Sequence, residues 1–470
     1  MRLIKTNEKN TVLRQLTTAE AESVRRYCGA GMKAEEKDAQ VVAGILAEMH
    51  NGKEPRYWLE CDCLDGDPSG PRPRMTARIY GDGPRHFVRI VGRDKHSCVL
   101  KAFRTDPSED EDDAHAEPGK HRPLRPIRNS LDYLDKAHEA GGKRPSGQAG
   151  SGSGTSRRRR LPKLGRILYT LLEQAGFSTV STNDLDAGKK SVSPWVRLKR
   201  FAVEEEVTEA LTLGNMMTTE AWIKPGDFMA QVDKLQWPKG KKRMGYLLFV
   251  ADGVSASAAT KFTKVGPAVV SPASEIRIGG RDQNFANPPY WVLAVMDRDD
   301  SGIARVREAF AQHAFKMLEP VPLDSSYERH TLTSLLKVME WVKKRGVTVT
   351  LKKPLFDSEV TLADGTTAHC RADFELEVPA PPGSMAAPGR LLIETMGADL
   401  QEYLEQKVAT HSIMRRRGRI IEHVVRHDGE QADRDDRLRK RVFAALLELA
   451  GVPRQEQAGA DDSEISKSEI

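Results

Sequence analysis

The stretch between Thr105 and Arg160 limits what this 470-residue chain can fold into. It holds an acidic run at 109–113, prolines at positions 118, 123 and 126, and a Gly-Ser-Gly-Ser-Gly segment at 150–154. Such a composition offers too few apolar side chains to offset the entropy of ordering a core. The chain is also longer than a single ordinary domain, which takes about 100 to 200 residues. We therefore predict a flexible linker over 105–160.

Apolar periodicity on both sides of this stretch predicts a multidomain protein of the α/β (α+β) class. Residues 1–104 are expected to form a small mixed module of zinc-ribbon character. Residues 161–320 form a middle domain without a motif, which is a candidate for DNA contact, and 321–452 form a mixed sheet flanked by helices. The polar residues 453–470 predict a disordered tail.

Charge and hydropathy exclude several classes of protein. The net charge of +6 is small for this length, so that only local clusters can indicate nucleic acid binding. The longest apolar stretch, 291–296, is too short to cross a bilayer, which needs about 20 residues. Five cysteines without an export signal do not indicate disulfides. We expect a cytoplasmic protein without a membrane segment.

Two acidic residues stand at strand ends in the last domain. Asp373 lies in the sequence Arg-Ala-Asp-Phe-Glu-Leu, and Glu394 follows the apolar residues 391–393. The Pro- and Gly-rich segment 379–389 predicts a hairpin loop that brings both acids to one edge of the sheet. Carboxylates in such an arrangement can hold Mg²⁺ beside a phosphodiester. Lys407 lies on the face of a predicted helix, 400–416, that points toward the same edge.

These residues resemble the PD-(D/E)xK nuclease superfamily, whose pattern runs from a helix with Glu through a strand with Asp to a strand ending in Glu-x-Lys. By this resemblance Glu328, Asp373 and Glu394 take the acidic positions. The resemblance implies a restriction-endonuclease-like fold and DNA hydrolysis with Mg²⁺ or Mn²⁺. Met396 stands in the usual lysine position and Ala372 in the place of a proline. Either Lys407 supplies the amine, or the site is inactive.

Simpler interpretations of these residues stay open. Ser325-x-x-Glu328 is also a capping box, in which the glutamate accepts a backbone N–H. Asp373 and Glu394 can be ordinary solvated acids, with Arg371 or Arg390 as cross-strand partners. Lys407 can be an exposed helical lysine in an ion pair.

Cysteine and histidine are paired in two places in the first domain. Cys61-Asp62-Cys63 and His96-Ser97-Cys98 offer four ligands in two tight pairs, as a tetrahedral structural Zn²⁺ site requires. The spacer of one residue is shorter than that of the usual knuckle. The alternative is that the cysteines are small buried side chains in a strand. Cys28 and Cys370 are interpreted as core residues.

Basic residues cluster at 157–160 and again after the predicted helix. Arg415, Arg416, Arg417 and Arg419 lie close in sequence to the acidic site and can neutralise DNA phosphates. Compensation of charge at a helix end is the alternative.

The whole layout resembles competence-associated nuclease-like proteins and an uncharacterised bacterial family of conjugative and other mobile elements. If the chain resembles that second family, the methionine at position 396 would be a characteristic of the family and not a local loss of the lysine. This implies a DNA nuclease that acts in transfer or defence, with protein partners in such a complex. The alternative is a DNA-binding or scaffold protein with a degenerate nuclease fold, and an interaction protein without nucleic acid is a third interpretation.

Overall fold

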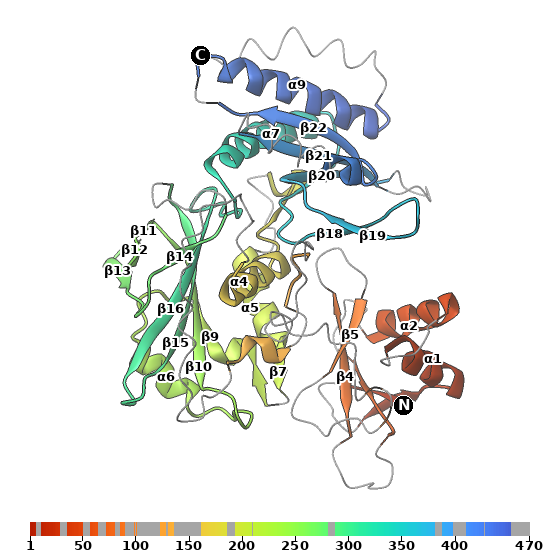
Figure 1. Ribbon diagram of the computed structural model, residues 1–470, viewed down its shortest axis with the longest axis vertical. Coiled ribbons are helices and arrows are strands. Elements are labelled where there is room, and N and C mark those ends of the chain that lie inside the picture. Colours follow the sequence, from red (N-terminus) through yellow and green to blue (C-terminus); the bar gives the residue numbers. More distant parts are fainter. Residues whose placement is uncertain are drawn as a thin grey trace.

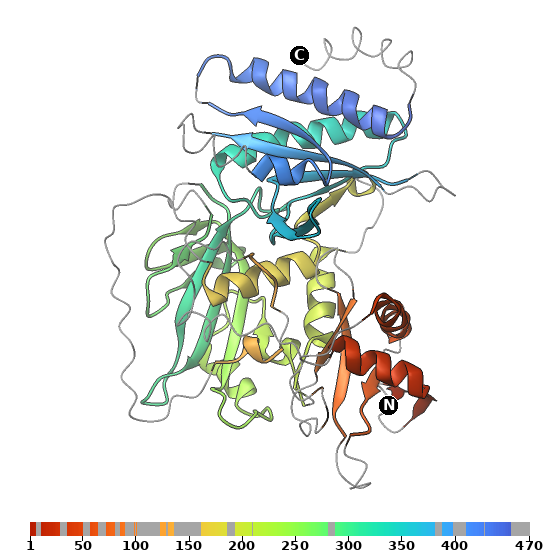
Figure 2. The ribbon, with the colours of Figure 1, turned by 45° about the vertical axis from the view of Figure 1, so that its right-hand side comes forward.

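The fold is that of a computed structural model, shown in Figures 1 and 2, with a helix-and-sheet module at the amino terminus, a large middle sheet and a carboxyl-terminal layer of helices on a sheet. The structure describes residues 1–5, 11–28, 35–49, 57–63, 72–79, 85–89, 98, 100, 123–127, 130–135, 161–185, 193–208, 210–280, 287–380, 388–397, 410–426 and 428–452.

The amino-terminal module is a five-stranded sheet with two helices. The strand order is β2-β1-β3-β4-β5, and all neighbours are antiparallel. Its core includes Leu3, Val24, Ile45 and Leu59. The module is therefore mixed, as predicted, and an apolar core between helices and sheet lies beside the cysteines on which the predicted zinc-ribbon character depends. The elements are β1 Arg2–Lys5, β2 Val12–Gln15, α1 Thr18–Cys28, α2 Glu36–Met49, β3 Tyr57–Glu60, β4 Arg74–Ile79 and β5 Arg85–Arg89.

The middle region is built around a sheet with the strand order β14-β16-β15-β10-β9. Strands β10 and β15 are buried along almost their whole length, because separate apolar clusters cover the two faces of the sheet. A small sheet, β11-β12-β13, lies beside it. The strands are β7 Glu206–Thr208, β8 Leu211–Thr212, β9 Met217–Thr218, β10 Met244–Ala251, β11 Gly253–Val254, β12 Ala259–Thr263, β13 Gly266–Val270, β14 Arg277–Ile278, β15 Tyr290–Arg298 and β16 Ala304–His313. The helices are η2 Ser130–Tyr133, α4 Lys163–Gln174, η3 Thr182–Leu185, α5 Pro194–Glu204, η4 Leu213–Met216 and α6 Pro225–Val232.

The linker prediction over 105–160 needs a correction within 123–135. Ile127, Tyr133 and Leu134 are buried in the core of the middle region. The hydroxyl of Tyr246 donates to the carbonyl of Tyr133, which fixes this segment on strand β10. The few apolar side chains of this segment pack on the core of the middle region. Such a long-range contact cannot be predicted from the local amino-acid composition. Within the predicted linker the structure describes only residues 123–127 and 130–135. The predicted tail, 453–470, lies outside the described residues.

The carboxyl-terminal domain is a mixed five-stranded sheet with the order β22-β21-β20-β17-β6. Only β21 and β22 are parallel among these neighbours. Helices α7 and α9 cover one face, as Figure 2 shows, and the hairpin β18–β19 packs with Met414 on the other. The elements are α7 Ser326–Lys344, β17 Thr350–Lys352, β18 Ser358–Thr361, β19 Thr367–Cys370, β20 Phe374–Val378, β21 Gly389–Met396, β22 Arg419–Val424 and α9 Gln431–Leu449.

One strand crosses the predicted boundary between the middle and last domains. Strand β6, Thr179–Ser181, follows helix α4 in sequence but pairs with β17 at the edge of the carboxyl-terminal sheet. The two regions are therefore joined by main-chain hydrogen bonds. Within the part of the chain that the structure describes, no helix combines the length and apolar character that crossing a membrane requires.

Candidate active site and cysteine cluster

The structure brings Asp373 and Glu394 together. Strands β20 and β21 pair with Phe374 opposite Ile393, and the same register continued by one residue puts the two acids opposite each other. The amide of Asp373 donates to Oε1 of Glu394 over 3.1 Å, and the amide of Thr395 donates to Oδ2 of Asp373 over 2.7 Å. Both side chains are buried. The predicted hairpin thus holds each carboxylate by a backbone N–H from the other strand.

Glu328 reaches the same region from the first turn of α7. Its Oε2 accepts the amide of Asp324 over 2.9 Å and lies 2.8 Å from Nζ of Lys353. The hydroxyl of Ser325 accepts the amide of Glu328 over 3.3 Å, so that one half of the capping interaction is present as well. Burial raises the pKa of Glu328 to about 7, although the lysine opposes that shift. This carboxylate is therefore poised between its two protonation states near neutral pH.

Lys353 is the residue that sequence reasoning missed. It follows strand β17, is buried, and lies 3.2 Å from Oδ2 of Asp324 in addition to its contact with Glu328. Burial opposes its charge, but the carboxylates of Asp324, Glu328 and Asp373 outweigh this effect and raise its pKa. A cation thus stands in the acid cluster although Met396 occupies the usual lysine position. The sequence signal that could have revealed Lys353 is its position directly after β17, the strand that pairs with β20.

The middle region supports this cluster. The hydroxyl of Tyr169, on α4, donates to Oδ1 of Asp324 over 3.3 Å and to Oε1 of Gln312 over 2.8 Å. Nη2 of Arg371 lies 3.7 Å from Oδ2 of Asp324. Asp324 is consequently surrounded by donors and cations from both regions, which allows its carboxylate to stay buried beside Lys353.

A chain of side chains leads from helix α9 to Asp373. Nε2 of His423 lies 2.9 Å from Oδ1 of Asp435, and its Nδ1 lies 2.8 Å from the hydroxyl of Thr331. The hydroxyl of Thr331 is in turn 2.9 Å from the hydroxyl of Thr395. The backbone amide of Thr395 donates to Oδ2 of Asp373. Burial lowers the pKa of His423, so that the neutral ring is favoured. The chain therefore fixes the backbone that holds the Asp373 carboxylate.

His411, in the segment 410–418 that precedes β22, also lies close to Glu394. Its Nε2 lies 3.6 Å from Oε2 of Glu394, and its Nδ1 lies 3.2 Å from Oε1 of Glu422. Nε2 of His411 and Oε1 of Glu328 are both buried atoms without a hydrogen-bond partner. One offers a nitrogen lone pair and the other a carboxylate oxygen, so that the donor set fits a divalent cation.

The acid cluster is not closed around an ion. Among the described residues, the one group of three potential ligands whose atoms lie within 4.8 Å of one another consists of cysteines. Glu328, Asp373 and Glu394 would have to rotate their side chains inward to share a cation. Lys407 lies outside the described residues.

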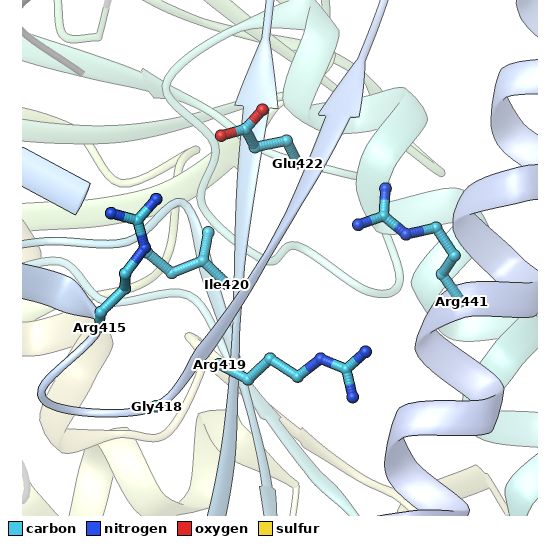
Figure 3. Close-up of a pocket in the computed structure, with 6 residues that line it drawn as sticks. All are labelled: Arg415, Gly418, Arg419, Ile420, Glu422 and Arg441. Atoms are coloured by element: carbon cyan, nitrogen blue, oxygen red, sulfur yellow. The ribbon is translucent and has the colours of Figure 1, made fainter. Parts of the chain in front are cut away.

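The basic residues after His411 have different environments. Arg417 forms an ion pair with Glu375 through its two terminal guanidinium nitrogens, Nη1 and Nη2, so that it is a structural residue. Arg415 and Arg416 are exposed, and Arg419 lies 3.2 Å from the exposed Glu448. Figure 3 shows Arg415 and Arg441 on either side of the strand that carries Glu422. The open pocket between them has a volume of about 520 Å³ and is lined by Arg415, Gly418, Arg419, Ile420, Glu422 and Arg441.

The cysteine cluster lies in the amino-terminal module. The Sγ atoms of Cys61, Cys63 and Cys98 are within 4.8 Å of one another, and those of Cys61 and Cys98 are 3.9 Å apart. Zn–S bonds of about 2.3 Å in a tetrahedron separate two sulfurs by roughly 3.8 Å. Burial raises the pKa of the Cys61 and Cys98 thiols. The geometry fits zinc, and His96, the fourth predicted ligand, lies outside the described residues.

The alternative interpretation of the cysteines also has a basis in the structure. Cys61 belongs to the apolar core of the module, and Cys63 and Cys98 pack against that core. Cys28 is buried in the same core, and Cys370, the last residue of β19, is buried in the cluster that the β18–β19 hairpin forms with Leu392 and Met414, as predicted for core residues.

Comparison with known proteins defines the class. A family model described as a restriction endonuclease-like C-terminal domain matches residues 324–445, and two models described only as domains of unknown function match 1–106 and 123–314. The last domain is thus restriction-endonuclease-like. An Escherichia coli protein titled "Uncharacterized protein in cib 5'region" is 36% identical over 154 residues, which are 32% of this chain and 69% of that protein. The chain belongs to the same family as that protein. No solved structure matches the chain.

Proposed function

We propose that the protein is a metal-dependent DNA nuclease. The observation that carries this proposal is the meeting of Asp373 and Glu394 across two strands of a restriction endonuclease-like domain, next to the buried pair Glu328–Lys353. Asp373 and Glu394, with Oε1 of Glu328, would hold Mg²⁺ or Mn²⁺. A bound cation of this kind supplies charge stabilisation at a scissile phosphate and activates water.

The protein's own side chains would perform the remaining tasks. The ammonium of Lys353 would stabilise negative charge that develops on the phosphate, the role that Lys407 was predicted to have. Glu328 would direct Oε1 at the cation while its Oε2 stays paired with Lys353. The chain from Asp435 through His423 and Thr331 would keep the Asp373 carboxylate in place.

The arginine pocket supports DNA as the substrate. Arg415, Arg419 and Arg441 surround an open space at the edge strand β22, and Glu422 connects this space with His411 and the acid cluster. Guanidinium groups bind phosphates in pairs of hydrogen bonds. A DNA backbone that follows β22 would pass from these arginines to the acids, with Arg416 as a further exposed contact.

Zinc would have a structural task in this protein. Cys61, Cys63 and Cys98, with His96, would bind Zn²⁺ and tie the end of strand β3 to the segment around residue 98. By resemblance alone, we also propose action in mobile-element transfer or defence, with protein partners there. We also propose that the protein acts in the cytoplasm, where it would meet its DNA substrate.

The second candidate is a DNA-binding or scaffold protein without catalysis. It is favoured by Met396 at the lysine position and by the absence, among the described residues, of three acidic ligands within 4.8 Å. Such a protein would keep the arginine pocket but cut no DNA.

Cleavage of supercoiled and linear DNA with Mg²⁺ or Mn²⁺ tests the proposal. Asp373→Asn and Glu394→Gln keep the size of each side chain, and each should slow cleavage by at least about 100-fold. Glu377→Gln, a half-exposed acid on the same strand β20, is the matched control and should cut normally. Salt-dependent DNA retention without cleavage by the wild type would establish the second candidate instead.

A further inference from the structure

We propose that His411 supplies an imidazole nitrogen to the divalent cation of the acid cluster, which would make the site selective for Mn²⁺ over Mg²⁺. This inference rests on the proposed function, because it concerns the same cation. The three-dimensional contacts give His411 a specific position between Glu394 and Glu422.

The contact between His411 and Glu394 is the first step of the argument. Nε2 of His411 lies 3.6 Å from Oε2 of Glu394, and both side chains are almost completely buried. Nε2 has no hydrogen-bond partner. Metal–ligand bonds of roughly 2 Å put neighbouring ligands of one cation about 3 to 4 Å apart. The separation is therefore longer than a normal hydrogen bond and suited to a cation between the two atoms.

Glu422 determines which ring nitrogen faces the acid. Strands β21 and β22 are parallel with Glu394 beside Glu422, and His411 lies against both glutamates. The carboxylate of Glu422, 3.2 Å from Nδ1, favours a proton on that nitrogen. Nε2 then presents its lone pair to Glu394. A histidine held by a carboxylate on one nitrogen, with the other directed at a metal, is the usual orientation of a histidine ligand.

The chemistry of the ligand decides the choice of metal. Mg²⁺ prefers oxygen ligands, whereas an imidazole nitrogen is a good ligand for transition metals. In such a site the carboxylates of Asp373 and Glu394 would still bind Mg²⁺. Nε2 of His411 would add a ligand that increases the affinity for Mn²⁺. A proton or a water molecule between Nε2 and Glu394 is the competing explanation, and it predicts no effect of His411 on metal binding.

Mn²⁺ binding to the full-length protein tests the inference without reference to cleavage. Free Mn²⁺ is measured by electron paramagnetic resonance, and nitrogen coordination by electron spin-echo modulation of the bound ion. The wild type should show a coordinated nitrogen. His411→Gln should lose this signal and bind Mn²⁺ at least about tenfold more weakly, with Mg²⁺ affinity changed much less.

Two further variants keep the test informative. Glu422→Gln changes a half-exposed side chain that is less important for folding, and it should weaken Mn²⁺ binding through the orientation of His411. His369→Gln is the matched control, because Nε2 of His369 is also buried without a hydrogen-bond partner but faces Glu359. It should bind Mn²⁺ as the wild type does.

The outcomes separate this inference from the proposed function. Mn²⁺ binding that is lost in Glu394→Gln but unchanged in His411→Gln, without a nitrogen signal, would overturn the role of His411 alone. A wild type that binds neither Mn²⁺ nor Mg²⁺ would overturn the cation site, and with it both proposals.

Discussion

In the amino-terminal module three sulfur atoms lie within 4.8 Å of one another, whereas the described residues of the carboxyl-terminal domain include no three acids that are as close. The difference follows from charge. Thiols whose pKa is raised by burial are neutral and can pack in an apolar core without a counter-ion. Carboxylates in the same position repel each other and lose hydration, so that each needs a donor or a cation.

In the acid cluster, side chains and backbone amides of the protein supply these donors and cations. Lys353, Arg371 and backbone amides surround the carboxylates, and Glu328 responds to its burial with a raised pKa. The cysteine cluster is thus assembled before a metal arrives, while the acid cluster is stabilised by the protein and has to rearrange. Each experiment below tests one side of this contrast.

The largest effect is expected from Lys353→Met. The change leaves Glu328 and Asp324 buried without their cation, which should lower the free energy of unfolding by about 3 to 5 kcal/mol. Denaturant unfolding measures the loss. The double variant with Glu328→Gln should recover part of it, and Lys352→Met, in a looser ion pair, should cost about 1 kcal/mol or less. A loss that is equal for both lysines would refute the proposed dependence of the cluster on Lys353.

Removal of zinc should have the next largest effect. At a free zinc concentration 100 times the dissociation constant, bound metal stabilises a fold by about 2.7 kcal/mol. Cys98→Ser should reduce the bound zinc, measured by elemental analysis, from about one equivalent to near zero. It should also make thermal unfolding insensitive to a chelator. Cys28→Ser, another cysteine in contact with this core, should keep the metal. Folded wild type without zinc would show that the cysteines serve packing alone.

The pKa of Glu328 predicts a pH dependence of stability. Its folded value of about 7 is above the ordinary value of 4.5, so the folded state holds a proton that the unfolded state has released between these pH values. This contribution to stability is present below pH 4.5 and is lost as the pH rises through 7. Over this window it amounts to roughly 2 to 3 kcal/mol. The difference between wild type and Glu328→Gln, followed by denaturant unfolding against pH, should show this slope. A flat difference would mean that Lys353 keeps Glu328 ionised throughout.

The smallest effect concerns the arginine pocket. Arg415→Ala and Arg441→Ala should each reduce the slope of log binding constant against log salt by about 0.9, the value for one phosphate contact. Fluorescence anisotropy with a DNA duplex at several salt concentrations measures it. Lys199→Ala, an exposed lysine on α5, removes the same charge elsewhere and should leave the slope unchanged. Equal slopes in all variants would argue against DNA at this pocket.

Local sequence was sufficient for most secondary structure of the last domain. The apolar residues 391–393 lie in β21, and Glu394 follows them toward the end of that strand, as the sequence predicts. The pairing of Asp373 with Glu394 could also be predicted, because the apolar residues of both strands have to face the core, which fixes their register. Strands β1 and β2 were missed, since each has only four residues and mixes polar with apolar side chains.

Long-range contacts decided the rest. Lys353 entered the cluster because β17 pairs with β20, and His411 because the segment before β22 folds back over β21. Ile127, Tyr133 and Leu134 joined the core, and β6 joined a sheet more than 160 residues away in the chain. The sequence by itself determined which segments form helices and strands and which acids stand at strand ends, because those properties depend on neighbours along the chain. The tertiary structure alone decided which cation and which imidazole face these acids, because such partners are chosen by proximity in space.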